Sequence, residues 1–301
     1  MSAYQPGRQS REYHCLSKRE RSKVISEVNR RFREQTGVKR QLERIGASDR
    51  ELRHTWLRIR DAVMDGREQK QIEEDLDFQY EMFLYDLIDV VVSDMEMEGW
   101  TRGAKLLEIW SSRQPAVAPR YSAAVTDVVT MDWVLQFQRA KQVFDEIIRE
   151  RIWTNDASRQ RIAKLIKSKP TGALFGDLSL RVTEVDPSWI NSRSCTSGTN
   201  VDALTAALGA FLLQVAIAGT VTARVGAVVT VSISEVGVYV KDSFDFNEAQ
   251  FLGFWGHRDT PVNNATFRDW RAKFAKGGDF LVFSDIKRIK LTSPDLVTVT
   301  V

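Results

Sequence analysis

The chain has 301 residues, of which 43% are hydrophobic and 28% charged, so it is long enough for one large domain or two smaller ones. This composition is that of a soluble globular protein and excludes a disordered or fibrous one, and the formal net charge of +3 does not by itself indicate nucleic-acid binding. Two distant cysteines, Cys15 and Cys195, exclude a disulfide framework and a zinc pattern and fit a reducing compartment.

The first half of the chain has the periodicity of amphipathic helices. Ser17 and Ser48 are typical helix caps, each followed three residues later by glutamate, and Gly37 and Gly66 are typical helix ends. A long aromatic-rich segment and three further periodic segments follow. The predicted helices are residues 17–37, 48–66, 68–100, 101–112, 131–153 and 156–168.

The pattern changes where Pro170, Gly172 and Gly176 interrupt the helical period. The segments beyond alternate apolar and polar residues, which predicts strands at 178–182, 213–222, 228–241, 279–291 and 295–301, with a short helix at 264–276. We therefore predict an α+β fold: a helical N-terminal half, residues 1–166, a linker at 167–176, and a β-rich, mostly antiparallel C-terminal domain, residues 177–301, with one or two short helices.

One uncharged segment, residues 203–223, is long enough to cross a bilayer. Its apolar residues alternate with smaller or polar ones from Leu213 onward, and this period of two is typical of a strand and not of a membrane helix. A strand is therefore the first interpretation of this segment, and membrane permeabilisation stays as an alternative.

The stretch KDSFDFNEAQFLGFWGHR, residues 241–258, combines two carboxylates with an imidazole and a guanidinium. Asp242 and Asp245 can hold Mg²⁺ through oxygen ligands, Arg258 can bind phosphate oxygens, and His257 can act as a general base. Phosphoester cleavage needs these groups. The alternative is structural: the aspartates cap a turn, His257 and Arg258 lie in an exposed loop, and the aromatic residues pack in the core.

Other chemical motifs are missing from the sequence. It contains no glycine-rich phosphate loop, no GxSxG elbow and no HExxH helix. Of the three histidines, His14 and His54 have no acidic cluster around them, and Cys195 has no histidine near it in sequence. The stretch at residues 241–258 is therefore the leading candidate site.

Four segments carry a wider resemblance: VTMDWVLQFQRAK, DALTAALGAFLLQVAIAG, GVYVKDSFDFNEAQFLGFW and FRDWRAKFAKGGDF. They resemble an uncharacterised proteobacterial domain family whose members are found near type VI secretion and other interbacterial-competition loci. The resemblance implies a secretion-apparatus component or chaperone and a cognate immunity protein as partners. Because the N-terminus, MSAYQPGRQSREYHC, has no apolar core, we expect no cleavable signal peptide. We expect it to be made in the bacterial cytoplasm and secreted into the periplasm of a target cell.

The segment DSFDF with HR downstream is similar to the active-site signature of colicin M-like bacteriocins, which cleave lipid II with magnesium. The resemblance implies catalytic roles for Asp242, Asp245, His257 and Arg258, with the two aspartates as metal ligands. The sequence departs from the pattern in two ways: Phe244 stands in place of a tyrosine, and eleven residues separate Asp245 from His257. The neighbouring residues that would bind the lipid-linked substrate are Phe244, Phe246, Asn247 and Trp255.

The leading functional hypothesis is an antibacterial effector that cleaves a lipid-linked peptidoglycan precursor with Mg²⁺. The alternative of a different class is a non-catalytic effector adaptor or immunity-type binding protein. A membrane-permeabilising toxin is the third. A nucleic-acid partner is not expected, because the basic residues of the first 60 positions lie on predicted helix faces, where solvation is their usual role.

Overall fold

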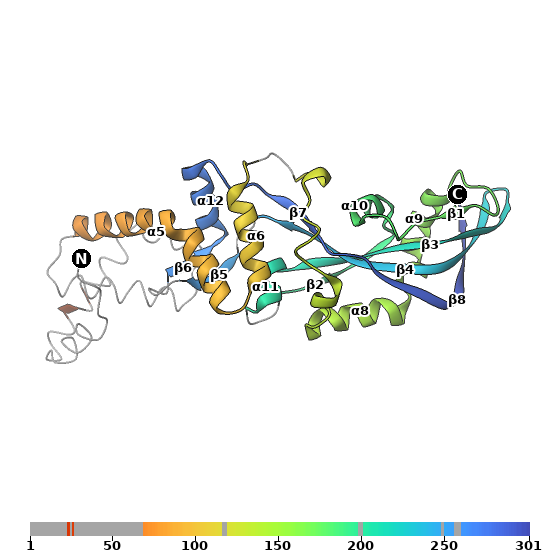
Figure 1. Ribbon diagram of the computed structural model, residues 1–301, viewed down its shortest axis with the longest axis horizontal. Coiled ribbons are helices and arrows are strands. Elements are labelled where there is room, and N and C mark those ends of the chain that lie inside the picture. The colour runs from red at the N-terminus through yellow and green to blue at the C-terminus, as the bar shows by residue number, and fades with distance from the viewer. Residues whose placement is uncertain are drawn as a thin grey trace. The chain divides into compact units, whose positions relative to one another are not determined.

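The computed structural model describes residues 23–24, 26, 69–115, 119–197, 201–247, 250–255 and 260–301 (Figure 1). The chain divides into two compact units. Unit 1 contains the described residues of Met1–Val91 together with Phe246–Lys276, and unit 2 contains Val92–Asp245 and Gly277–Val301. Both units contain helices and strands. How the chain divides into independently folding domains, which the sequence places at residues 1–166 and 177–301, stays a prediction.

The centre of unit 2 is a six-stranded sheet in which every pair of neighbouring strands is antiparallel. The long strands β3 and β4 form its middle. β1 and β2 pair with the outer edge of β3, and β7 and β8 pair with successive parts of the outer edge of β4. The strands are β1 Leu174–Phe175, β2 Asn191–Cys195, β3 Phe211–Val225, β4 Val228–Phe244, β7 Phe280–Phe283 and β8 Lys287–Thr300.

The β3–β4 hairpin follows from the alternation of the sequence. Leu213, Val215 and Ile217 lie on one face of β3 and are buried. The strands are joined at Gly226, whose φ of 59° suits a glycine in a two-residue turn. Register shifts near Gly219 and between Ile233 and Glu235 mark bulges, which increase twist, and the long strands curl accordingly (Figure 1).

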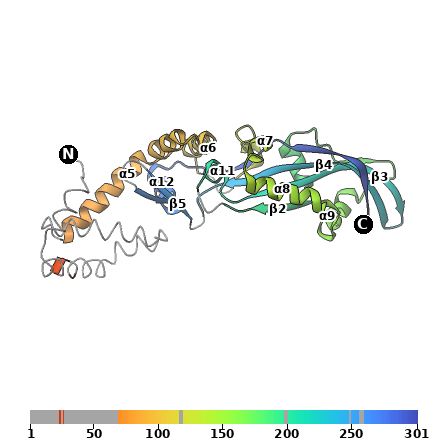
Figure 2. The same ribbon diagram turned by 90° about the horizontal axis from the view of Figure 1, so that it is seen from below.

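Helices cover both faces of this sheet. On one face, α8 (Gln138–Glu150) runs beside β2, and α9 (Asp156–Ile166) packs against β8 (Figure 2). On the other face, α10 (Val182–Val185) and the following 3-10 turn η3 (Asp186–Ser188) pack on Ala216 and Tyr239. The sheet is therefore buried on both sides over its central part, which explains why successive residues of β3 are buried.

The remaining elements of unit 2 are short helices and turns. They are α6 (Thr101–Ser112), η1 (Tyr121–Ala123), α7 (Met131–Val134), η2 (Ile152–Thr154) and α11 (Ala203–Leu208). α6 lies closely against α11, since a Cβ on Gly103 would stand 3.0 Å from the backbone of Ala206.

Unit 1 consists of a long helix, a two-stranded sheet and a short helix. These are α5 (Gln69–Met97, the part up to Val91), the antiparallel pair β5 (Phe251–Trp255) and β6 (Thr260–Asn263), and α12 (Asn264–Phe274). Asn263 caps α12 by accepting a hydrogen bond from the Thr266 backbone N–H at 3.1 Å. The rings of Tyr85 and Phe274 make an edge contact at 5.3 Å, which joins α5 to α12.

The predicted fold class is wrong in its arrangement, although the chain is broadly α+β. The described helices lie mainly between residues 83 and 166, where α8 and α9 pack on the sheet of unit 2 and α6 lies against α11, and they do not form a separate helical half. The β-rich part contains more than one or two short helices, because α10, η3 and α11 alternate with its strands and α12 follows β6. α10, η3 and α11 are too short to produce a helical period in the sequence, whereas α12 is the short helix that the sequence predicts.

Several individual elements differ from the prediction. The strand predicted at 178–182 is wrong, since these residues lead into α10, and the helix predicted at 131–153 is divided into α7, α8 and η2. The strands predicted at 279–291 and 295–301 divide instead at residues 284–286. The predicted helices at 17–37 and 48–66 fall almost entirely outside the described residues.

The uncharged segment at 203–223 forms α11 and most of β3, as its alternation predicts. Leu213, Val215 and Val221 have no exposed surface and belong to the core of unit 2. Within the described ranges, no helix has the length and apolar character that crossing a membrane requires.

Candidate functional site

The two predicted catalytic carboxylates lie at the C-terminal end of β4. Asp242 pairs with Val282 of β7, and Asp245 follows directly after the last residue of the strand. Both side chains are partly buried. Since residues alternate along a strand, Asp242 lies on the same face of β4 as Val240 and Phe244, and on the face opposite to Lys241.

Asp242 is in an environment that disfavours its charge. The partial burial of the carboxyl group raises the pKa of Asp242 well above its ordinary value. The nearby charge of Asp245 raises the pKa further, while a hydrogen bond from the Ser243 backbone N–H opposes the shift. Burial has the largest effect, so this environment favours the protonated form of Asp242.

The aromatic residues next to the aspartates are engaged in packing. Phe244 stacks on Phe280 of β7, with ring centroids 5.4 Å apart and planes inclined by 14°. Phe246 is buried in unit 1 and stacks on Phe267 of α12 at 4.0 Å. Both contacts agree with the structural interpretation of these rings, and Phe244 adds apolar surface to the face of β4 that carries Asp242.

The other predicted residues are distributed as follows. Asn247 is exposed, and the backbone carbonyls of Phe246 and Asn247 accept hydrogen bonds from Arg268 at 2.6 and 3.5 Å. Trp255 is buried in unit 1, where its Nε1 donates to the Leu252 carbonyl at 3.1 Å. Their roles in substrate binding stay predictions. His257 and Arg258 lie outside the described residues.

A buried polar cluster on the opposite face of β4 gave no signal in the sequence. Asp186 has no exposed surface and accepts hydrogen bonds from Tyr239 at 2.8 Å, Tyr121 at 2.5 Å and Lys241 at 2.6 Å. Lys241 also donates to Tyr121 at 3.0 Å and lies 5.7 Å from the centre of the Phe283 ring. These residues come from separate segments of the chain, so no local motif marks the cluster.

The positive charge of Lys241 is held by this cluster, through hydrogen bonds to Asp186 and Tyr121. Despite its partial burial, the pKa of Lys241 is raised by its hydrogen bonds to Asp186 and Tyr121. Burial raises the pKa of Tyr239, and the charge of Asp186 adds to that shift, so its phenol stays a proton donor. Lys241 is thus paired with a carboxylate on its own face of the sheet and does not neutralise Asp242 on the other face.

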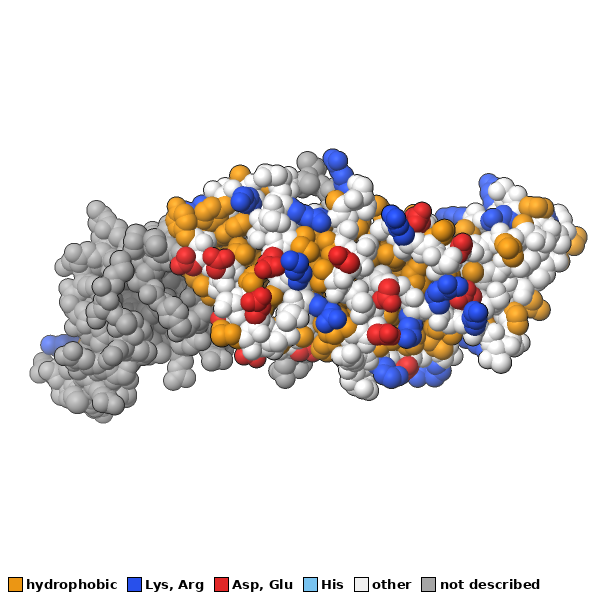
Figure 3. Space-filling view, in the orientation of Figure 1, with side chains coloured by type: hydrophobic (Ala, Val, Ile, Leu, Met, Phe, Trp, Pro, Cys, Tyr) orange, Lys and Arg blue, Asp and Glu red, His pale blue; other side chains and the backbone are white. Residues whose placement is uncertain are grey.

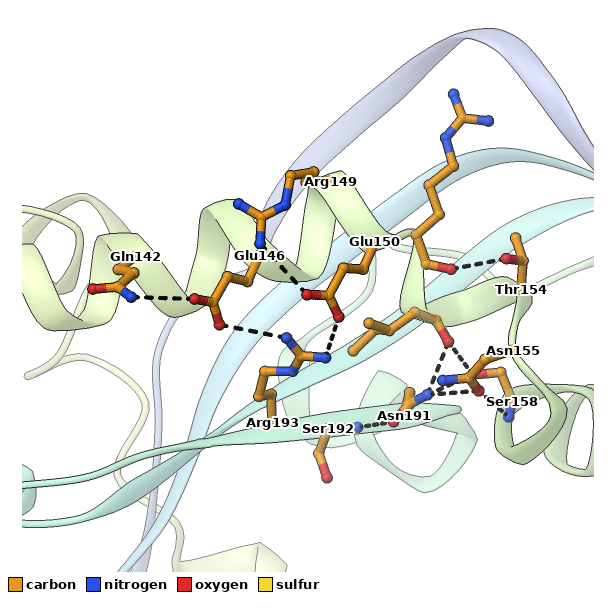
Figure 4. Close-up of polar contacts among 12 residues, drawn as sticks. Gln142, Glu146, Arg149, Glu150, Thr154, Asn155, Ser158, Asn191, Ser192 and Arg193 are labelled. Atoms are coloured by element: carbon orange, nitrogen blue, oxygen red, sulfur yellow. Dashed lines mark hydrogen bonds and ion pairs between the residues drawn. The ribbon is translucent and has the colours of Figure 1, made fainter.

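A second polar network joins α8 and η2 to β2 (Figure 4). Arg193 of β2 donates to Glu150 at 2.5 Å and to Glu146 at 3.4 Å, two glutamates one helical turn apart. Asn191 donates to the Ile152 carbonyl at 2.8 Å and to the hydroxyl of Ser158 at 2.8 Å. Arg149, whose guanidinium lies 3.5 Å from Glu150, adds a second positive charge, and the network fastens helices to the sheet.

Cys195 lies in a third polar region, near the ion pair between Arg139 and Asp202. The thiol is buried, and this burial raises its pKa, which disfavours the reactive thiolate. Arg139 binds Asp202 with two hydrogen bonds of 2.5 and 2.7 Å and lowers the pKa of that carboxyl to about 2. The geometry therefore supports a structural cysteine beside the cap of α11.

No group of three or more histidine, cysteine, aspartate or glutamate side chains that could hold a metal ion occurs in the described ranges. On the face that Figure 3 shows, basic and acidic side chains are interspersed over the described surface and do not form a patch of one sign. Of the predicted site residues that the structure describes, Asp242 is the one whose pKa is shifted most clearly.

The chain was compared with known families, curated proteins and solved structures. A model described as "Family of unknown function (DUF6402)" matches residues 85–260 and 257–299. No curated protein and no solved structure matches the chain. Nothing in these comparisons links it to type VI secretion or to colicin M.

Proposed function

The chain belongs to DUF6402, a family of unknown function, and we propose that it is a hydrolytic effector in competition between bacteria, with Asp242 as its acid. The observation that carries the proposal is the position of Asp242 at the end of β4, where burial and the neighbouring Asp245 raise its pKa. Carboxyl groups with raised pKa values are found preferentially at catalytic sites. The finer parts of the proposal, secretion by a type VI-like apparatus and a lipid-linked peptidoglycan precursor as substrate, rest on the local sequence resemblance.

The proposed reaction is hydrolysis of a phosphoester bond. The protonated carboxyl of Asp242 gives its proton to the leaving oxygen while the bond between that oxygen and phosphorus breaks. Water forms the new bond to phosphorus, and Asp245 accepts the proton that the water loses. A pair of carboxyl groups in different environments suits this division between acid and base.

Two features of unit 2 support Asp242 as the acid. Phe244 places an aromatic ring on the same face of β4, and this apolar surface disfavours a carboxylate. The nearest lysine in the sequence, Lys241, is bound to Asp186 on the opposite face. Although Lys241 is next to Asp242 in the sequence, its positive charge is therefore held on the other face of the sheet.

Magnesium stays a prediction, and no step of the proposed reaction passes through it. A metal ligand must be deprotonated, whereas burial favours the protonated form of Asp242. If magnesium is needed, Asp242 and Asp245 are the residues that would hold it, and activity would then be lost with a chelator. The acid mechanism without magnesium predicts no such loss.

The test uses the purified full chain and its variants Asp242→Asn and Asp245→Asn. Asp132→Asn, at an exposed ion pair with Lys287, is the matched control. We expect the parent and the control to hydrolyse lipid II. The rate of Asp242→Asn should be lower by a factor of about 100 or more, because general acid catalysis accelerates reactions about 10²–10⁴-fold. The rate of the parent should fall as pH rises through the pKa of Asp242.

Expression in bacteria adds a second readout. The parent should be toxic when directed to the periplasm, and Asp242→Asn should not be. Equal toxicity of parent and variant, with both folded by circular dichroism, contradicts the catalytic assignment. Toxicity only in the cytoplasm contradicts the lipid-linked substrate.

A non-catalytic adaptor or immunity-type protein is the second candidate. It is favoured by exposed apolar side chains on the sheet of unit 2, with Leu174, Val225 and Leu296 each more than 70% exposed. A stable complex with the product of a neighbouring gene, together with an absence of hydrolysis and of toxicity in either compartment, would establish this alternative.

A further inference from the structure

The outer edge of β8 is an open edge of the six-stranded sheet. β8 pairs with β4 on one side, and across the ranges that the structure describes no strand pairs with its other side (Figure 1). Such an edge presents backbone N–H and C=O groups to which another strand can bind. The position of β8 therefore raises the question of what pairs with this edge.

The register shows which backbone groups point outward. The Val301 N–H donates to the Ala227 carbonyl at 2.9 Å, so these residues form a hydrogen-bonded pair between the two strands. Because such pairs alternate along an antiparallel ladder, Val299 and Val297 also direct their N–H and C=O groups toward β4. The backbone groups of the residues between them point to the outer edge. These residues are Leu296, Thr298 and Thr300.

The side chains at this position agree with that assignment. Thr230 and Thr298 are cross-strand partners, and their hydroxyl oxygens lie 3.1 Å apart. Side chains approach each other most closely in the pairs that do not exchange backbone hydrogen bonds. Thr298 therefore has its backbone groups directed away from β4.

The two halves of β8 differ in how their edge is protected. The first half contains Lys287, Arg288 and Lys290, and Pro294 lies beside the register shift opposite Ile233. Charges, proline and bulges are the devices that prevent strand addition. The second half has no charged residue after Asp295, and Leu296 is 71% exposed. The first half of β8 is thus protected against strand addition, and the second half is accessible to another strand.

Asp295, the charged residue that directly precedes Leu296, is bound to residues of η2 and of the turn before it. It accepts hydrogen bonds from Arg151 and, at 2.9 Å, from the indole N–H of Trp153. Its carboxylate is paired and does not repel an approaching strand. The segment that remains available is Leu296–Thr300, which is uncharged and rich in β-branched residues.

We propose that the edge Leu296–Thr300 pairs with the same edge of a second copy of this chain, antiparallel and about a two-fold axis at Thr298. In this register Thr298 lies opposite Thr298 of the second copy, and Leu296 lies opposite Thr300. The outward N–H and C=O groups of all three residues in each copy then find partners, which gives roughly six hydrogen bonds. The two sheets become one continuous sheet.

The choice of a second copy follows from the self-complementarity of this edge. A two-fold interface needs a surface that matches itself, and the segment meets this condition in both side-chain type and charge. The exposed Leu296 would be covered, and no like charges would face each other. Because one short strand pair buries less area than a standard interface, the dimer should be reversible and its share should rise with protein concentration.

The first test measures the mass of the purified full chain by sedimentation over a wide concentration range. We expect a monomer–dimer equilibrium for the parent and a monomer for Thr298→Pro. Proline removes an outward N–H and the exposed hydroxyl contact with Thr230, but no backbone hydrogen bond to β4, so the variant should stay folded, which circular dichroism checks. The control Thr298→Val keeps the backbone groups and should dimerise like the parent.

The second test fixes the register by cross-linking. In a Cys15→Ser background, Thr298→Cys should form a disulfide-linked dimer, since opposing Cα atoms of a hydrogen-bonded pair are about 5.5 Å apart, within the range that a disulfide spans. Thr292→Cys, exposed on the same strand outside the paired segment, should form no disulfide-linked dimer. A parent that is monomeric at every concentration, a Thr298→Pro variant that still dimerises, or equal cross-linking at both positions overturns the proposal.

Discussion

The Lys241 ammonium lies 2.6 Å from the Asp186 carboxylate, although 55 residues separate the two in sequence and Asp186 has no exposed surface. Tyr239 and Tyr121 donate to the same carboxylate. Lys241 and Asp242 are neighbours in the chain, but the pleat of β4 directs them to opposite faces of the sheet. Each therefore has its own electrostatic environment, and the properties of Asp242 depend on where Lys241 is held.

Removal of the Asp186 carboxylate should destabilise the protein strongly. Asp186→Ala leaves the phenol of Tyr239 without its acceptor and the ammonium of Lys241 without its partner in a largely buried region. We expect the free energy of unfolding to fall by about 3–5 kcal/mol, the usual cost of breaking a buried ion pair from one side. Urea denaturation measures it. Asp132→Ala, which removes an exposed ion pair with Lys287, should cost at most about 1 kcal/mol. Equal losses in the two variants would contradict the prediction.

Asp242→Asn should become increasingly more stable than the parent as pH rises. Burial raises the pKa of Asp242 in the folded state above its value in the unfolded chain. Below the unfolded pKa of about 3.9 the carboxyl is neutral in both the folded and the unfolded chain, and it costs the parent no stability. As pH rises through the higher folded pKa, the parent loses stability, because the unfolded chain carries the charged carboxylate more easily than the folded protein does. Asparagine does not titrate and avoids this loss. Thermal unfolding from acidic to alkaline pH measures the difference, and an advantage of Asp242→Asn that does not grow with pH would contradict the prediction.

Asp202→Asn should behave in the opposite way. The hydrogen bonds from Arg139 lower the pKa of Asp202 to about 2, so the charged carboxylate stabilises the fold above the unfolded pKa, and this contribution is lost as pH falls toward about 2. Asparagine can still cap α11 by accepting from the Thr205 N–H, so the substitution removes the charge and the second hydrogen bond from Arg139 but keeps the cap. The advantage of the parent over the variant should be largest near pH 7 and should shrink steadily as pH falls toward about 2, as measured by urea unfolding. A difference that does not change with pH would contradict the role of the ion pair.

Gly277→Ala should destabilise unit 2 through a steric conflict with Trp110. Gly277 has a φ of +95°, and a Cβ there would lie 2.5 Å from a carbon of the Trp110 ring, which is fully buried. We expect a loss of about 1–3 kcal/mol from overpacking in addition to the backbone cost. Gly172→Ala is the matched control, because Gly172 has a similar φ of +83° and a Cβ there would meet no atom within 4 Å, so it should cost only about 1 kcal/mol. Thermal unfolding compares the two, and equal effects would exclude the steric explanation.

The candidate site could be predicted only in part. Asp242 and Asp245 are visible in the sequence because they follow an alternating strand and stand three residues apart. The sequence does not show that burial affects Asp242 so strongly, since that depends on the atoms that other segments place around its carboxyl group. Asp186 gave no signal at all, because its partners Tyr121, Tyr239 and Lys241 are distant in the chain.

The sequence by itself determined the elements whose signals are local. The helix at 101–112, the start of α12 next to Asn263 and the alternation of β3 and β4 depend on residues a few positions apart, which set helix caps and strand faces. Only the tertiary structure decided that β8 is an outer strand, which of its backbone groups face outward, and that Lys241 is bound on the face opposite to Asp242. These properties arise from pairing between distant segments, and the energy of such pairing depends on register and burial, which no local pattern specifies.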